Sequence, residues 1–284
     1  MRSIDLDSLE IFRAVVREGG IVRAAARLHR VQSNITTRIK QLEQRLGVPL
    51  FQRQGRALAL TAPGQALLVH AEQLLRMADE AEAAVRAMPV RGPLRLGSME
   101  STAGSRLPKL LARFHQRQPD IGIELQTGTT ALLLRKLADH ALDAAFVGEP
   151  FPVGELPSRP VFDEELVLVT AKAHAPVGRA TDLEASTVLA FAQCCSYRKR
   201  LEEWFALDGT RPERVMELAS YQAIIACAAA GTGCGIVPAS LLGALHASKD
   251  IRQHPLPEPL RHNRTHLVWN GEPGPALREF LDTV

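Results

Sequence analysis

Three helical patterns in close succession fill the first 46 residues and limit most strongly what the chain can fold into. Apolar residues recur at helical spacing in residues 6–16, and Gly19-Gly20 ends that helix. A second helix, residues 21–29, has a face of small side chains that lets another helix cross closely. The third runs from residue 32 or 33 to 46 and ends before Gly47. Its apolar residues form one stripe, Ile35, Ile39, Leu42 and Leu46, so the opposite face points outward. The pattern predicts a helix-turn-helix.

The outward face of the third helix begins with short hydrogen-bonding side chains instead of the Glu and Lys typical of a solvated helix. Asn and Gln pair with adenine, Arg pairs with guanine, and Thr methyl groups touch thymine methyl groups. The alternative is an exposed polar helix without a partner. The segment that follows, residues 49–61, favours DNA, because it predicts two short strands around a glycine turn with Arg53 and Arg56 at the tip. Such a basic hairpin is a wing that can hold phosphates.

The charge distribution agrees with a polyanion at this end of the chain. Residues 1–63 carry eleven basic and five acidic side chains, a net charge of +6, whereas the whole chain has +3, which leaves −3 for the remainder. We therefore expect residues 1–63 to bind DNA. The predicted DNA-binding residues are Arg30, Gln32, Ser33, Asn34, Thr36, Thr37, Arg38, Lys40, Arg53 and Arg56.

The order of motifs in this segment resembles the winged helix-turn-helix of LysR-type transcriptional regulators. The motifs are Ala25-Ala26-Arg27-Leu28, Gln32, Thr36-x-x-Ile39, Gln41-Leu42-Glu43, Leu46 to Phe51, Arg53, Arg56 and Leu60-Thr61-x-x-Gly64. Two positions depart from the family pattern: Gly20 stands where Ser or Thr usually caps the second helix, and Thr36 where Ser is frequent. The resemblance implies a regulator that binds promoter DNA, with RNA polymerase as a candidate further partner.

A long helix is predicted after the wing, with apolar residues alternating at spacings of four and three. This heptad pattern predicts a coiled coil, so two heads would bind one DNA site with dyad symmetry. The alternative is a single helix packed on its own domain. Because alanine-rich contacts bury little surface, the dimer needs further contacts, and the resemblance implies tetramers for many members. The predicted dimerisation residues are Leu67, Ala71, Leu74, Ala78, Ala81, Val85 and Met88.

Beyond a break at residues 88–93, strands and helices alternate, which predicts α/β units around a largely parallel sheet. Expected helices cover 107–117, 132–138, 198–207, 221–230 and 275–282; expected strands cover 94–97, 121–126, 144–147, 165–170, 187–191, 236–237 and 266–269. Marks such as Leu107-Pro108, Leu142-Asp143 and the glycine block 229–238 resemble the LysR effector-binding domain. The resemblance implies two α/β lobes, like those of periplasmic binding proteins, joined by two crossing strands.

The predicted architecture is thus an α+β multidomain chain. It comprises a winged helix-turn-helix (1–62), a coiled-coil linker helix (63–91) and a two-lobed α/β effector-binding domain (92–284). Lobe I covers about 92–163 and 267–284, and lobe II covers about 164–266.

Four loops between a strand and a helix are the expected effector site, because a two-lobed protein binds ligands at such loops beside helix N-termini. Hydroxyl groups and Arg198 favour a carboxylate, whereas Glu100 favours an amine or an amino acid, so a small charged metabolite is expected. The alternative is that each hydroxyl only caps its helix. The predicted residues are Glu100, Ser101, Thr102, Thr127, Thr129, Cys195, Ser196, Tyr197, Arg198, Ser220 and Tyr221.

Other function classes have less support. A redox-sensing regulator would use Cys194 and Cys195 before a helix, but no partner cysteine follows before Cys227. A hydrolytic enzyme lacks motifs such as GxSxG or HExxH, so we expect no catalytic residue, metal or cofactor. A simple ligand-binding protein would not bind DNA, so the basic N-terminal segment would have no function in it. No apolar run approaches the length of a membrane span, so a cytoplasmic protein is expected.

Overall fold

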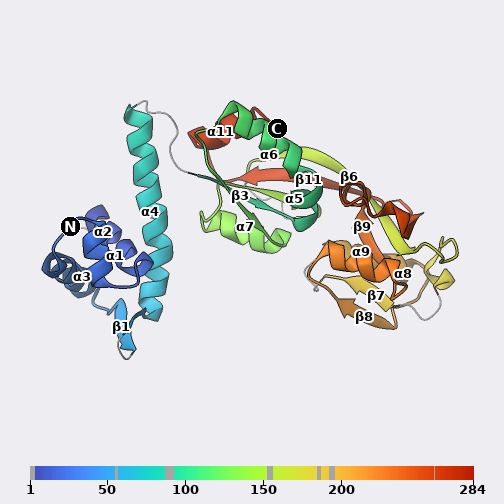
Figure 1. Ribbon diagram of the computed structural model, residues 1–284, viewed down its shortest axis with the longest axis horizontal. Coiled ribbons are helices and arrows are strands. Elements are labelled where there is room, and N and C mark those ends of the chain that lie inside the picture. Colours follow the sequence, from blue (N-terminus) through green and yellow to red (C-terminus); the bar gives the residue numbers. More distant parts are fainter. Residues whose placement is uncertain are drawn as a thin grey trace. The chain divides into compact units, whose positions relative to one another are not determined.

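The computed structural model describes all residues except 1–3, 55–56, 87–92, 152–155, 184–186, 192–195 and 259. It divides into two compact units, Met1–Pro89 and Val90–Val284, which we call the head unit and the sensor unit (Figure 1). None of the described helices is long and apolar enough to cross a membrane.

The head unit begins with the three predicted helices, α1 (Leu6–Arg17), α2 (Ile21–Arg27) and α3 (Gln32–Leu46). Asp5 caps α1 by accepting a hydrogen bond from the Ser8 amide at 2.8 Å. Gly47 ends α3 in the left-handed region, at a φ of 72°. The predicted stripe on α3 is confirmed for its buried members, which pack with α1 in one core: Leu9, Phe12, Ile35, Ile39 and Leu42.

The wing follows as an antiparallel pair, β1 (Phe51–Gln54) and β2 (Ala57–Leu60). Glu43 of α3 ties the wing to the helix, because its carboxylate accepts from the amides of Leu50 and Phe51 at 2.8 and 3.2 Å. Phe51 also packs its ring against Phe12, with ring centroids 5.3 Å apart. The predicted pair of strands is confirmed; the turn at 55–56 and Arg56 lie outside the described residues.

The linker helix α4 (Ala62–Arg86) packs one side of its first half against the core of the head, and other residues along it are exposed. Leu67 and Ala71 are buried against the head core with α1, so the structure gives them a different use from the predicted pairing seam. The physical reason is that α1 needs an apolar cover, which α4 supplies with the stripe that ends at Leu75. Leu74 stays 41% exposed and Val85 88% exposed, whereas Met88 lies outside the described residues. Ala78 is half-buried and Ala81 is exposed.

The sensor unit is built on a seven-stranded sheet in the order β10-β6-β11-β5-β3-β4, with β9 also paired to β6. Its strands are β3 (Leu94–Ser98), β4 (Ile123–Thr127), β5 (Ala144–Gly148), β6 (Ser158–Ala171), β9 (Gly235–Pro238), β10 (Ile251–Pro255) and β11 (His262–Trp269). A separate parallel pair is formed by β7 (Thr187–Ala190) and β8 (Arg214–Glu217). The helices are α5 (Glu100–Ser105), α6 (Leu107–Arg117), α7 (Thr130–Ala138), α8 (Ser196–Leu207), α9 (Tyr221–Ala229), α10 (Ala239–Ala244) and α11 (Pro275–Leu281), with short 3₁₀ turns at Ala180–Asp182 and Ala247–Lys249.

Two long strands, β6 and β11, connect the lobes, as Figure 1 shows. They pair antiparallel with each other, and β9 and β10 pair antiparallel with β6. The prediction of a largely parallel sheet is therefore wrong: in the main sheet only β3–β4 and β3–β5 are parallel among the described pairs. The reason is that the chain leaves lobe I along β6 and returns along β11, so the two connections run in opposite directions.

Each lobe has its own hydrophobic core. In lobe I, helices α6 and α11 pack on the sheet around Phe114, Phe146 and Phe280. In lobe II, Trp204 of α8 and Ile224 of α9 are among the residues that fill a second core. The rings of Phe114 and Phe280 pack edge to face with their centroids 5.1 Å apart.

The stability of lobe II is expected to depend on pH through buried His254. Its Nε2 lies 2.8 Å from the Thr170 hydroxyl, and its Nδ1 accepts from the Val177 amide at 3.1 Å, which requires an unprotonated Nδ1. Burial, then the charges of His174 and Arg252, lower the pKa of His254 below the ordinary value of 6.5. The unfolded chain therefore binds this proton at a higher pH than the folded chain, and stability falls as pH drops below about 6.5 towards the lowered pKa.

Urea denaturation of the full chain at pH 7.5 and 5.5 measures this dependence. The variant His254→Gln keeps hydrogen-bonding capacity without titrating, so it is expected to lose less stability between the two pH values. An equal loss in both proteins would contradict the assignment to His254.

Candidate DNA interface and ligand cavity

The N-terminal half of α3 presents the face that was predicted to read bases. Gln32, Ser33, Asn34, Thr37 and Lys40 are all exposed. Val31 precedes the helix and provides no side-chain cap, so the positive end of a 15-residue helix faces outward. An uncapped N-terminus of this kind suits a DNA phosphate beside the base edges.

Three other predicted DNA-binding side chains on or near α3 already have partners within the head. Asp7 of α1 forms ion pairs with both Arg30 and Arg38, each with a nitrogen–oxygen distance of 2.6 Å. The Thr36 hydroxyl donates to the Gln32 carbonyl at 3.0 Å. The arginine pairs hold α3 against α1, and DNA contact by these three residues stays a prediction. Arg53 is exposed on β1.

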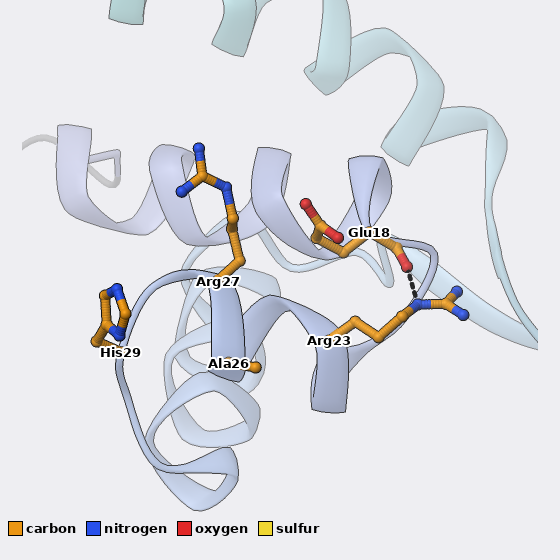
Figure 2. A pocket seen from close by; sticks show the side chains of 5 residues that line it. All are labelled: Glu18, Arg23, Ala26, Arg27 and His29. Atoms are coloured by element: carbon orange, nitrogen blue, oxygen red, sulfur yellow. Dashed lines mark hydrogen bonds between the residues drawn. The ribbon is translucent and has the colours of Figure 1, made fainter.

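An open hollow beside α2, of about 420 Å³, adds basic side chains that the sequence analysis did not single out. Figure 2 shows its lining, in which the Arg23 guanidinium lies against the backbone of Glu18. Arg23 donates to the carbonyl oxygens of Glu18 and Gly19 and thereby closes the turn between α1 and α2. Arg27 and His29 also line the hollow. The sequence signal for them was the basic outward face of the second helix.

A cavity of about 210 Å³ lies between the two lobes of the sensor unit, at the loops where the sequence analysis expected an effector. Lobe I contributes the start of α5 and the loop between β4 and α7, and lobe II contributes the starts of α8 and α9. Seven predicted residues line it: Glu100, Ser101, Thr127, Thr129, Ser196, Tyr197 and Tyr221. Sequence reasoning missed Met99, Gly128, Thr130, Phe191 and Ala219, which are neighbours of those positions in the same loops.

The remaining predicted effector residues do not line the described cavity. Ser220 caps α9 by accepting from the Gln222 amide, which matches the capping alternative. Thr102 is buried within α5. Arg198 is buried and its guanidinium pairs with Glu217 and Glu202, at 2.9 and 3.0 Å, so its charge is already balanced. Cys195 lies outside the described residues.

Glu100 joins the two lobes at the cavity. Its carboxylate oxygens lie 3.3 and 3.4 Å from the amide nitrogen of Tyr221, the first residue of α9, and accept its hydrogen. Burial raises the pKa of Glu100, and the hydrogen bond from Tyr221 opposes that rise. The cavity therefore contains one partly desolvated carboxyl group, Glu100, which accepts a hydrogen bond from the first amide of α9.

Two free thiols lie in the described residues, half-buried Cys227 and buried Cys234. Burial raises the pKa of Cys234 to about 12, which leaves its thiol protonated and inert. Cys194 and Cys195, on which the redox hypothesis depends, lie outside the described residues. Within the described part of the chain, no cluster of His, Cys, Asp and Glu could hold a metal ion.

Comparison with known proteins agrees with this architecture. Residues 6–65 match the bacterial regulatory helix-turn-helix of the lysR family, and residues 88–284 match the LysR substrate binding domain. The chain is 38% identical over 278 residues to the uncharacterized HTH-type transcriptional regulator YusT of Bacillus subtilis, covering 97% of this chain and 93% of that protein.

Solved structures show the same fold over the full length. A full-length variant of OxyR from Pseudomonas aeruginosa superposes with a TM-score of 0.74 at 23% identity, covering 100% of this chain and 95% of that one. Full-length CbnR in complex with its target DNA has a TM-score of 0.69 at 24% identity and covers 99% of both chains. With a helix-turn-helix, a two-lobed sensor and matches to both family domains, the chain belongs to the LysR family of transcriptional regulators.

Proposed function

We propose that two or four copies of this regulator bind promoter DNA with dyad symmetry, and that a small charged metabolite in the cavity between the lobes controls that binding. The exposed, uncapped start of α3 carries the DNA part of the proposal. The cavity lined by four strand-to-helix loops supports the effector part. In this proposal the chain acts in the cytoplasm without catalysis, and RNA polymerase is a further partner.

A gel shift with the DNA upstream of the chain's own gene tests the proposal at low salt. We expect a retarded complex that weakens as salt rises, because basic side chains release counterions from phosphates. Addition of the effector is expected to change the affinity or the mobility of the complex. Absence of any complex at low salt would contradict the DNA-binding proposal.

Two substitutions in the head are expected to separate phosphate contacts from base contacts. Arg53→Ala removes an exposed charge from the wing, so it should weaken all DNA sequences about equally. Gln32→Ala removes a side chain from the start of α3 and should cost roughly 1–3 kcal/mol at one base position only. Gel shifts with the operator and with single-base variants measure both. Equal losses on every sequence for Gln32→Ala would contradict its assignment to a base.

The exposed half of α4 is the proposed pairing surface. Leu74 and Val85 are eleven residues apart, so they lie on nearly the same side of the helix, and both are exposed. Ala81 lies between them on the chain and is also exposed. Burial of this surface against a second copy would remove apolar side chains from water.

The double variant Leu74→Glu with Val85→Glu is expected to shift the chain from dimer or tetramer towards monomer and to weaken operator binding. Two like charges would face each other across the helix pair, which opposes association. Analytical ultracentrifugation measures the oligomeric state. Val69→Glu is the matched control, since Val69 is also exposed but lies about 140° around the helix from Leu74. If the control dissociates equally, or the double variant stays associated, the pairing surface is elsewhere.

A further inference from the structure

The charge of the cavity between the lobes restricts what can bind there. Among the twelve described residues that line it, Glu100 is the one with a carboxyl side chain; the described lining has no Lys, Arg or His. A ligand carboxylate would therefore face a partly desolvated acid without a cation to balance the pair, and like charges at close range repel.

At the starts of α9 and α7, three backbone amides that could hold an anion already donate to oxygens of the protein. At the start of α9, Tyr221 donates its amide hydrogen to Glu100 and Gln222 donates to the Ser220 hydroxyl. At the start of α7, the Leu132 amide donates to the Thr129 hydroxyl at 3.3 Å. An anion at either of these two helix starts would have to displace these oxygens, and at α9 one of them belongs to the Glu100 carboxylate.

Three aromatic rings, with Ser196 and Ala219, line the lobe II side of the cavity. Phe191 and Tyr221 have ring centroids 4.6 Å apart, and Tyr197 lies 6.3 Å from Tyr221. Tyr197 is buried and its hydroxyl accepts from Asn263 of β11 at 3.3 Å, so its ring is fixed in place. The faces of aromatic rings attract cations, most strongly where water is excluded.

We propose that the effector is a small organic ammonium ion, whose charge is held by Glu100 and whose carbon substituents pack against Phe191, Tyr197 and Tyr221. The hydroxyl groups of Thr127, Thr129 and Ser196 line the same cavity and accept hydrogen bonds from ammonium hydrogens. This proposal rests on the proposed function, because it names the chemical class of the ligand in that cavity.

The experiment uses full-length protein and four probes of similar size: n-butylammonium, choline, butyrate and 1-butanol. Isothermal titration calorimetry gives the dissociation constants, and a rise in melting temperature reports binding independently. We expect at least tenfold tighter binding of one or both cations than of butyrate or 1-butanol. Equal or tighter binding of butyrate or 1-butanol, or no binding of either cation, would overturn the proposal.

Substitutions show whether a bound cation occupies this cavity. Glu100→Gln removes the charge but keeps an oxygen acceptor for the Tyr221 amide, so we expect at least tenfold weaker cation binding. Glu124→Gln is the matched control, because Glu124 is exposed on β4 and does not line the cavity. Phe191→Leu keeps an apolar side chain without a ring and is expected to weaken choline binding at least threefold. Unchanged binding in both Glu100→Gln and Phe191→Leu would overturn the assignment.

Gel shifts on the same protein samples separate this inference from the proposed function. Tight cation binding without any change in DNA affinity would contradict effector control but leave the ligand class standing. An effect of butyrate on DNA affinity, lost in Glu100→Gln, would support effector control and overturn the ammonium assignment.

Discussion

Replacing Arg106 with methionine is expected to lower the free energy of unfolding of the sensor unit by about 3 kcal/mol, because it leaves the Glu164 carboxylate buried without its cation. Glu164 is 2% exposed and accepts from Arg106 Nε at 2.7 Å, with a further hydrogen bond from the Ser240 hydroxyl at 2.7 Å. Arg106 is 35% exposed, so we place the loss at the lower end of the range for buried pairs. Urea denaturation of the full chain measures it.

The neighbouring pair of Arg261 and Glu165 supplies the matched control. Its side chains are 40% and 44% exposed, so Arg261→Met is expected to cost less than about 1 kcal/mol. Adding Glu164→Leu to Arg106→Met removes the unpaired charge and should restore much of the lost stability. Equal losses at Arg106 and Arg261 would show that burial of Glu164 does not set the cost.

Gly233→Ala is expected to destabilise lobe II by about 3 kcal/mol, because the new methyl group meets a backbone atom that cannot move freely. A Cβ at Gly233 would lie 2.1 Å from the carbonyl oxygen of Thr187, the first residue of β7. The same oxygen accepts the Cys234 amide hydrogen at 3.0 Å, so relief of the clash would break the link between the glycine block and β7. Thermal or urea unfolding measures the loss.

Gly243→Ala is the control for this effect. Gly243 lies in α10, and a Cβ there has no heavy atom within 4 Å. The change should leave stability unchanged or raise it by up to about 1 kcal/mol, since alanine favours helices. A similar loss of stability in both variants would mean that the clash with the Thr187 carbonyl oxygen is not the cause.

The helices and the wing could be predicted because their signals are local. The four apolar residues of α3 recur on one side of the helix, and Gly47 marks its end. The glycine block follows directly on the end of α9, and Gly233 within it approaches Thr187 closely. These features need no knowledge of distant parts of the chain.

Long-range features could not be predicted in the same way. An apolar stripe on α4 fits a partner helix and the chain's own α1 equally well, and the burial of Leu67 and Ala71 depends on where α1 lies. The direction of β6 relative to β11 depends on pairing between residues about a hundred positions apart. The sequence did not indicate that Arg198 pairs with Glu217, because Glu217 lies 19 residues further along the chain; Arg198 was therefore predicted to bind an anion.

The loops at the cavity are an intermediate case. Their positions followed from the alternation of strands and helices, and seven expected side chains do line one cavity. The sign of the charge that the cavity favours could not be predicted from the sequence, because it depends on which charged side chains are paired with other residues of the protein. Arg198 is balanced by two acids, whereas Glu100 has an amide hydrogen from Tyr221 and no cationic partner among the described lining residues.

The paired strands that join the lobes also restrict how the sensor can deform. A connection made of two single, unpaired segments could twist and slide, but β6 and β11 are hydrogen-bonded from Glu165 with His262 to Ser158 with Val268. Sliding of one strand past the other would break that ladder, whereas bending perpendicular to its plane keeps it. The register shifts between Thr265 and His266, where β11 also pairs with β5 of lobe I. A change in the angle between the lobes is therefore expected to bend this pair of strands out of its plane while the two strands stay in register.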